Sequence, residues 1–358
     1  MKEIEIKVRR LLLKIFLSFF KAERSSVEIP GEPKVLIIRL NKIGDALVTT
    51  PLITLLKTKK QADITVLADK KNHFVFRRNP YVAETKIFEK GFTGFRKTLA
   101  WINSGKFDVI VDAHDDVSTT VSFIVALAKA PNKYALEKGN ANIFTRTISK
   151  TDPRKTHIVE RVAEIAKLFD VNFGVNDLQI FYQPSEDSIR KAESFISANI
   201  KNKKYLLGIN ISAGSDARFW GVENYRRIIN WLGNFEDLEI IILRAPADKK
   251  KAEEISNGKI PVFNDESFDE FAAIISKLDL LFTPDTSAVH LASAFGIPVF
   301  GLYVHYNTED MIWSPYKSEF DCVITKSETL SDIDYHQVIK QLKPFIRKIF
   351  YGEENSRL

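Results

Sequence analysis

The sequence contains almost no cysteine: a single thiol, Cys322, occurs in 358 residues. An intramolecular disulfide and a cysteine-rich zinc site are both excluded, because each needs at least two thiols. This cysteine usage is typical of a reducing compartment such as the cytoplasm. We therefore expect Cys322 to be a small core residue.

Long apolar runs are also missing. A transmembrane helix needs roughly 18 or more consecutive apolar residues, and no segment supplies them. Hydrophobic residues make up 45% and charged residues 27% of the chain, as in an ordinary water-soluble globular protein. We expect the body of the protein to be soluble and cytoplasmic.

The formal charge is +6. Such an excess fits nucleic acid, anionic lipid or a phosphorylated substrate, since all three carry concentrated negative charge. The basic residues are dispersed and no nucleic-acid-binding motif accompanies them, so we expect no nucleic-acid partner.

The first thirty residues differ from the rest, because basic residues flank an interrupted apolar run. Residues 1–30 predict a basic amphipathic helix, and no small-residue cleavage site follows, so an exported signal peptide fits poorly. Two interpretations stay open: residues 1–28 lie on the anionic inner face of the cytoplasmic membrane, or the helix packs on the protein itself. The apolar stripe comprises Ile4, Val8, Leu11, Leu12, Ile15 and Phe19.

The remaining chain alternates short β-branched runs with longer amphipathic stretches, which predicts parallel sheets covered by helices. Its length favours two domains of about 150 residues each. We predict Rossmann-like domains at 31–184 and 185–335 and a C-terminal helix and tail at 336–358, with a ligand cleft between the two domains. The predicted strands are 35–40, 64–68, 85–88, 109–112, 205–211, 239–243, 280–283 and 299–303, and the predicted helices 46–57, 223–232, 249–256, 268–277 and 286–295.

In open α/β sheets ligands bind beyond the carboxyl ends of strands, and three loops there carry chemistry. The first follows the first strand and contains Gly44, which permits close backbone approach, and Asp45, which supplies a carboxylate. Asp45 could equally be an ordinary helix cap.

The second loop runs from Asn210 to Trp220 and combines small residues and hydroxyls with Arg218. An arginine presents a planar fork of donors to phosphate oxygens, so this loop is a candidate diphosphate site. The alternative is an ordinary loop with a surface arginine.

The third loop places Asp285 and Thr286 at a helix start, with His290 on the same helix. A helix start offers N–H groups to an anion. The alternative is that Asp285 is a cap and His290 a half-buried histidine.

Taken together, the three loops resemble glycosyltransferase family 9, the ADP-heptose:lipopolysaccharide heptosyltransferases. The family patterns are R-x-x-x-x-G-D-x-x-x-T-x-P, G-A-G-x-x-x-K-x-W and D-T-G-x-x-H-L-A. This chain matches them over roughly residues 34–316, with Arg39, Gly44, Asp45, Thr49 and Pro51, then Ala213, Gly214, Arg218 and Trp220, then Asp285, Thr286, His290, Leu291 and Ala292.

The resemblance implies a GT-B fold and an inverting glycosyltransferase that moves a heptose from an ADP-sugar to an envelope glycan such as the lipopolysaccharide core. Asp45 would be the general base and Arg218 would offset charge on the diphosphate. Other donor-binding residues would be Ser212, Gly214, Ser215, Asp248, Asp285, Thr286, Ser287 and His290, and the acceptor-side residues Lys42, Gly44 and Thr49.

Three departures from the family pattern affect this transfer of roles. Arg218 stands in place of a lysine, Ser287 in place of a glycine, and residues 304–307 in place of a glycine-proline turn. The donor or acceptor could therefore differ from the family's usual one.

Each alternative function would require a particular sequence feature. A dinucleotide-dependent oxidoreductase would need a G-x-G-x-x-G turn, which is missing. A non-catalytic nucleotide-sugar or glycan-binding protein would be indicated by loss of Asp45, which is present. The implied mechanism needs neither a cofactor nor a metal, although Asp112, Asp115, Asp116 and His114 form a cluster that could hold a cation.

Overall fold

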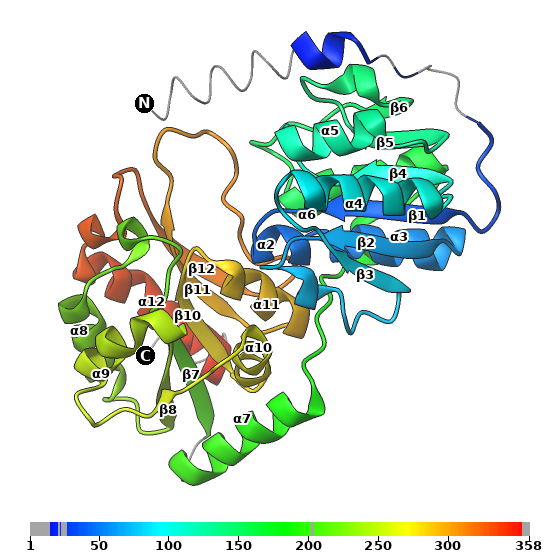
Figure 1. The fold of residues 1–358 in the computed structure, drawn as a ribbon. Helices are drawn as coiled ribbons and strands as arrows, with labels where there is room; N and C mark the ends of the chain where they lie inside the picture. The colour runs from blue at the N-terminus through cyan, green and yellow to red at the C-terminus, as the bar shows by residue number, and fades with distance from the viewer. Residues whose placement is uncertain (1–14, 21, 23–26, 202–203, 353–358) are drawn as a thin grey trace. The chain divides into compact units, whose positions relative to one another are not determined.

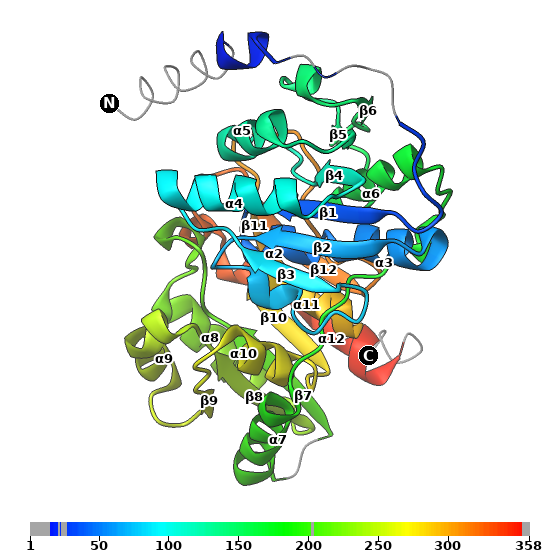
Figure 2. The same cartoon turned by 45° about the vertical axis from the view of Figure 1, so that its right-hand side comes forward.

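A computed structural model describes residues 15–20, 22, 27–201 and 204–352 of the chain. The chain divides into two compact units, Met1–Tyr182 and Gln183–Leu358, called unit 1 and unit 2 below. Each unit is built around one parallel β-sheet with helices on both faces (Figures 1 and 2).

Unit 1 contains a six-stranded sheet in the order β3-β2-β1-β4-β5-β6, with every neighbouring pair parallel. Helices α4 and α5 cover one face, and α3 and α6 the other (Figure 2). The strands are β1 (Lys34–Arg39), β2 (Asp63–Ala68), β3 (Glu84–Ile87), β4 (Val109–Asp112), β5 (Asn132–Leu136) and β6 (Arg146–Ile148), and the helices α2 (Ile43–Leu47), α3 (Thr50–Lys60), α4 (Phe92–Ser104), α5 (Thr119–Leu127) and α6 (Ile158–Ala163).

Unit 2 repeats this plan with the order β12-β11-β10-β7-β8-β9, again parallel throughout. The strands are β7 (Tyr205–Asn210), β8 (Leu238–Leu243), β9 (Val262–Phe263), β10 (Leu280–Pro284), β11 (Val299–Val304) and β12 (Phe320–Thr325). The helices are α7 (Glu186–Asn199), α8 (Val222–Leu232), α9 (Lys249–Ser256), α10 (Phe268–Ile275), α11 (Ser287–Phe295) and α12 (Tyr335–Tyr351).

Both strand orders are those of a Rossmann fold, in which the chain reverses direction across the sheet beside its first strand. The reversal lies between β1 and β4 in unit 1 and between β7 and β10 in unit 2. The predicted α/β class with two Rossmann-like units is confirmed.

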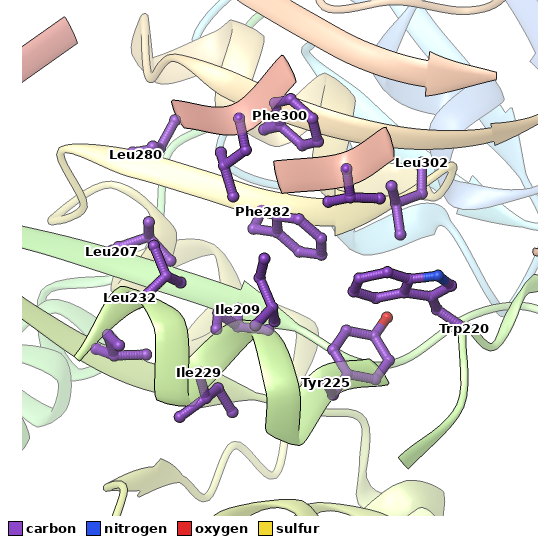
Figure 3. Close-up of a cluster of buried hydrophobic side chains, with 14 of the residues drawn as sticks. Leu207, Ile209, Trp220, Tyr225, Ile229, Leu232, Leu280, Phe282, Phe300 and Leu302 are labelled. Atoms are coloured by element: carbon purple, nitrogen blue, oxygen red, sulfur yellow. The ribbon is translucent and has the colours of Figure 1, made fainter. Parts of the chain in front are cut away.

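The core of unit 2 is dominated by aromatic and branched side chains. Figure 3 shows Trp220 and Tyr225 beside Phe282, with ring centroids 5.6 Å apart for Trp220 and Tyr225 and 5.8 Å for Trp220 and Phe282. Trp220 is fully buried, and its indole N–H donates to the carbonyl of Ile333 at 3.0 Å. The loop that precedes Trp220 is therefore anchored in the core.

Most of the predicted N-terminal helix, namely residues 1–14, 21 and 23–26, lies outside the described residues, as do residues 353–358 of the predicted C-terminal tail. Residues 15–18 form a helical turn on unit 1. Leu17 is buried, the rings of Phe16 and Phe123 lie 4.2 Å apart, and Asn142 donates to the carbonyls of Leu17 and Phe20 at 2.7 and 3.1 Å. This part of the segment packs on the protein.

Candidate functional site

The predicted site residues gather at the carboxyl edges of both sheets, beside the points where the strand order reverses. In unit 1 they follow β1, and in unit 2 they follow β7, β8 and β10. This edge is where open α/β sheets bind ligands, because the loops leave a crevice there. Each unit thus carries its own cluster of polar side chains.

Asp45, in the first turn of α2, is bound by the buried side chain of Arg39 at the end of β1. Arg39 is fully buried; its Nη2 lies 3.0 Å from Oδ1 of Asp45, and its Nε donates to the Asp45 carbonyl at 2.9 Å. The N-cap residue of α2 is Lys42, and no side chain caps that helix. Asp45 is therefore an ion-pair partner of Arg39 and not the helix cap, so the capping alternative is wrong.

The two carboxylate oxygens of Asp45 differ in their surroundings. Oδ1 faces Arg39, while Oδ2 makes no hydrogen bond or ion pair with any residue in the described part of the chain. The side chain keeps 16% of its surface exposed. An oxygen of this kind can accept a proton from a hydroxyl group placed beside it.

The predicted acceptor-side residues have unlike environments. Lys42 is exposed, whereas Thr49 is fully buried and its hydroxyl donates to the Asp45 carbonyl at 2.8 Å. Gly44 lies within α2, directly before Asp45. Lys42 can touch a ligand from this position, while Thr49 holds the backbone of Asp45.

The carboxylates of the acidic cluster after β4 form ion pairs with lysine and arginine side chains of the same unit. Asp112 pairs with Lys138 at 2.8 Å, and Asp115 pairs with Arg161 at 3.0 Å. Burial by itself would raise the pKa of Asp112, but Lys138 and His114 hold that pKa well below its usual range. Within the described ranges, no group of three or more His, Cys, Asp or Glu side chains is arranged to hold a metal ion.

The loop after β7 is joined to the loop after β8 through Ser212. Its hydroxyl donates to Oδ2 of Asp248 at 2.6 Å and accepts from the Ala245 N–H at 2.6 Å. Asp248 also pairs with Lys251 at 3.2 Å. Ser212 and Asp248, predicted from separate motifs, thus share one hydrogen bond.

Farther along the same loop, Gly214 and Ser215 are exposed, and a Cβ added at Gly214 would meet no atom within 4 Å. Arg218 turns to the loop after β10. Its Nη1 lies 3.1 Å from Oδ2 of Asp285 and donates to the Asp285 carbonyl at 3.1 Å. The loop thus presents an exposed glycine and an arginine that is paired with Asp285.

Helix α11 begins at Ser287, directly after Thr286. The Thr286 hydroxyl caps the helix by accepting from the Ala288 N–H at 3.3 Å, so the cap is Thr286 and not Asp285. His290 lies one turn in, 3% exposed, with its ring 5.9 Å from that of Trp313. The start of α11 therefore faces the carboxyl edge of the sheet, and His290 lies behind it.

Lys251 was missed by the sequence reasoning. It pairs with both Asp248 and Asp216, at 3.2 and 3.4 Å, and its ammonium lies 4.5 Å from the ring centroid of Phe219. The signal was available, because Lys251 stands three residues after Asp248 at a helix start, where two such side chains meet.

The chain is similar in sequence to known glycosyltransferases. The sequence model of glycosyltransferase family 9 (heptosyltransferase) matches residues 95–343. The lipopolysaccharide core heptosyltransferase OpsX of Haemophilus influenzae is 22% identical over 288 residues, which are 77% of this chain and 80% of that protein.

Two solved structures share the fold. The glycosyl transferase family 9 structure from Veillonella parvula has a TM-score of 0.76 at 19% identity, covering 90% of this chain and 99% of its own. The Escherichia coli heptosyltransferase WaaC with ADP has a TM-score of 0.68 at 17% identity, covering 88% and 99%. At this identity the likeness shows the fold alone.

Proposed function

Because the chain belongs to glycosyltransferase family 9, we propose that it transfers a heptose from an ADP-sugar to a glycan of the cell envelope, such as the lipopolysaccharide core. The observation that carries the proposal is Asp45: a carboxylate held through Oδ1 by buried Arg39, with Oδ2 uncommitted, at the carboxyl edge of a Rossmann-like sheet.

The chain is a glycosyltransferase with a GT-B fold of two Rossmann-like domains. The relatives are heptosyltransferases, and none of the comparisons supports the alternative of a non-catalytic nucleotide-sugar or glycan-binding protein. Family 9 enzymes use nucleotide-sugar donors, so the donor class follows from the family.

The proposed donor site lies in unit 2. Arg218 would neutralise the diphosphate, with Ser212, Gly214 and Ser215 and the N–H groups at the start of α11 around it. Asp248 would accept hydrogen bonds from the ribose, Asp285 from hydroxyls of the sugar, and His290 would support them from behind. ADP is the proposed nucleotide because a family member of the same fold was solved with ADP.

In the proposed reaction, Asp45 takes the proton from an acceptor hydroxyl. The hydroxyl oxygen forms a bond to the anomeric carbon while the bond from that carbon to the phosphate oxygen breaks, and ADP leaves with the electron pair. Attack opposite the leaving group inverts the anomeric configuration. Arg218 and the positive end of α11 offset the charge that develops on the diphosphate, which is the charge stabilisation that transfer requires.

We propose that this charge stabilisation does not depend on a metal ion, since Arg218 and the start of α11 would supply the positive charge at the proposed diphosphate site. The expectation is unchanged transfer after treatment with EDTA and dialysis. Activity that falls on EDTA treatment and returns with magnesium or manganese would contradict it.

An anionic acceptor is supported by the charge at the carboxyl edge of unit 1. Lys42 follows β1, and Lys70, Lys71 and Arg77 follow β2; all four are exposed. Phosphate or carboxylate groups of an envelope glycan would be attracted to such an edge.

We further propose that the enzyme works in the cytoplasm on the inner face of the membrane, held there through its N-terminal segment. In the part of the chain that the structure describes, no helix combines the length and apolar character needed to cross a bilayer. Phe16, Leu17 and Phe20 bind the segment to unit 1, while Ile15 and Phe19, members of the predicted stripe, are 51% and 80% exposed. Exposed apolar side chains beside basic residues favour an anionic membrane surface.

Sedimentation with phosphatidylglycerol vesicles tests the membrane role. We expect the double variant Ile15→Ser, Phe19→Ser to bind the vesicles less than the wild type. Phe92→Ser is the matched control, because Phe92 is 77% exposed on the same unit. Equal loss in both variants, or no loss in either, would contradict the proposal.

Donor binding and transfer test the central proposal. ADP, ADP-heptose, UDP-sugars and GDP-sugars are compared by calorimetry, and transfer to a heptose-free core acceptor is then followed by mass spectrometry. Selective binding of the ADP compounds and addition of one heptose to the acceptor are expected. If no nucleotide binds, the proposed function is wrong.

A further inference from the structure

The imidazole of His114 bridges the ends of two neighbouring strands of unit 1. The ladder between β1 and β4 ends at Ile38 and Asp112, and side chains continue the connection from there. Nε2 of His114 accepts a hydrogen bond from the backbone N–H of Leu40, with 3.1 Å between the two nitrogens. His114 is only 1% exposed. One buried side chain thus ties the first residue after β1 to the loop after β4.

The partners of the ring nitrogens determine where the proton of His114 lies. A backbone N–H only donates, so Nε2 has to accept and carries no proton. Nδ1 lies 2.7 Å from Oδ1 of Asp112, a carboxylate that accepts, so the proton is on Nδ1. A second proton, on Nε2, would point at the Leu40 N–H and break that hydrogen bond.

Charged groups from three segments face the ring: Arg39 on β1, Asp112 on β4, and Lys138 after β5. Nζ of Lys138 pairs with Oδ2 of Asp112 at 2.8 Å and donates to the His114 carbonyl at 2.7 Å. Burial lowers the pKa of His114; Asp112 opposes this, and the positive charges of Arg39 and Lys138 lower it further. The neutral ring is therefore the stable form near pH 7.

The Leu40 amide begins the segment 40–45, which comprises the loop after β1 and the start of α2 up to Asp45. At the start of this segment, the Asn72 side chain donates to the carbonyls of Arg39 and Asn41 at 3.1 and 2.8 Å. At its end, Arg39 forms an ion pair with the Asp45 carboxylate and a hydrogen bond to the Asp45 carbonyl. Arg39 also donates to the carbonyl of Ala113, the neighbour of His114. The position of the Asp45 carboxylate is thus set by contacts at both ends of the segment 40–45.

We propose that His114 is a positioning residue for the transfer reaction: its neutral imidazole holds the Leu40 amide, and with it the loop that carries Asp45, where Asp45 can take the acceptor's proton. This inference rests on the proposed function, in which Asp45 is the base. His114 acts through the loop. Its loss should lower the rate, because a general base has to lie within hydrogen-bond reach of the proton it removes.

Two variants separate the positioning role from simple packing. The His114→Gln variant keeps an N–H donor for Asp112 and an oxygen acceptor for the Leu40 amide, and it does not titrate. The His114→Leu variant has similar size and neither group. We expect kcat to fall about tenfold or more in the leucine variant, with the donor KM within about twofold, and to stay within about threefold of wild type in the glutamine variant at pH 8.

The pH profile of kcat gives a readout that packing alone would not move. In the wild type, uptake of the second proton by His114 breaks the bond to Leu40 and lowers kcat on the acid side. In the glutamine variant this acid limb should move to lower pH. Wild-type kcat in the leucine variant would overturn the proposal.

Amide exchange of residues 40–45, followed by mass spectrometry, examines the loop without any turnover. Exchange should be about tenfold faster in the leucine variant and unchanged in the glutamine variant. Equal exchange in all three proteins, with an active wild type, overturns the role of His114 while the proposed function stands. A wild type that binds and transfers no sugar overturns the proposed function and the positioning role with it. Thermal unfolding of each variant confirms that the fold is retained.

Discussion

Arg218 contacts Asp285 through an ion pair and a hydrogen bond: Nη1 lies 3.1 Å from the carboxylate oxygen Oδ2 and 3.1 Å from the backbone carbonyl oxygen. The two residues follow different strands, β7 and β10, which are neighbours at the reversal point of the unit 2 sheet. The contact orients the guanidinium at the edge where we propose that the diphosphate binds.

Removal of the guanidinium is expected to weaken donor binding. Arg218→Ala should raise the Kd for ADP about tenfold to a hundredfold, because a charged hydrogen bond contributes about 1.5–3 kcal/mol. The Kd of Arg218→Lys for ADP should lie between those of the wild type and Arg218→Ala, since lysine keeps the positive charge and loses the planar fork of donors. Arg190→Ala, an exposed arginine on α7 of the same unit, is the control. Calorimetry that finds the same Kd in Arg218→Ala and Arg190→Ala would contradict the assignment.

Asp45→Asn is expected to abolish the base while keeping the oxygen that accepts from Arg39. Transfer should fall about 10²–10⁴-fold, the usual contribution of a general base, and the Kd for ADP should stay within about twofold. Asp63→Asn, an exposed aspartate at the opposite end of the strands, should leave the rate unchanged. Single-turnover kinetics and calorimetry measure the two effects. Substantial transfer by Asp45→Asn would exclude Asp45 as the base.

Substitution of Trp220 should lower both the free energy of unfolding of unit 2 and the affinity for the donor. Trp220→Ala is expected to cost about 3–5 kcal/mol, since a fully buried aromatic side chain is lost. Trp220→Phe refills most of the space and loses the hydrogen bond to Ile333, so its cost should be about 1–3 kcal/mol, with weaker ADP binding through the loop that ends at Trp220. Urea unfolding and calorimetry are the measurements. Wild-type stability and ADP affinity in Trp220→Phe would show that the anchor is unimportant.

Asp265 should make unit 2 less stable at high pH. The residue is 5% exposed, and burial raises the pKa of its carboxyl from 3.8 to about 6. Between these two values the folded protein holds a proton that the unfolded chain has lost, so the stability of the wild type falls as pH rises through this window.

The variant Asp265→Asn carries no such charge. Its free energy of unfolding should exceed that of the wild type by about 1–2 kcal/mol at pH 8, and the difference should vanish near pH 4. Glu328→Gln, at an exposed position of unit 2, is the control. Urea titrations from pH 4 to 8 measure it. A difference that does not change with pH would show that burial of the charge is not the cause.

Much of the fold was predictable from local patterns, and the failures have local causes. The predicted strand 35–40 appears as Lys34–Arg39 and the predicted helix 249–256 as Lys249–Ser256. The predicted helix 46–57 is wrong as a single element, because the chain forms α2 and then α3. Pro51 was the available signal: proline lacks an N–H and suits the first turn of a new helix.

Four strands were not predicted: β5, which is buried at four of its five positions, and β6, β9 and β12, which contribute little to the core. β9 has two residues, and β6 and β12 have few buried positions, so no apolar run marks them. They exist because a neighbouring strand offers them a hydrogen-bonding edge. Pairing of this kind joins residues that are distant in the chain, and no local pattern reports it.

The sequence by itself determined the central strands β1, β2, β4, β7, β8, β10 and β11 and the outer strand β3, with the loops that follow them and the residue types that those loops offer, since hydrophobic periodicity and turn residues are local properties. Only the tertiary structure decided what each side chain does there. Asp45 is held by Arg39, Asp112 is neutralised by Lys138, and Leu40 is bound by His114 from 74 residues away. Burial and charge pairing arise when separate segments meet, so they belong to the folded chain alone.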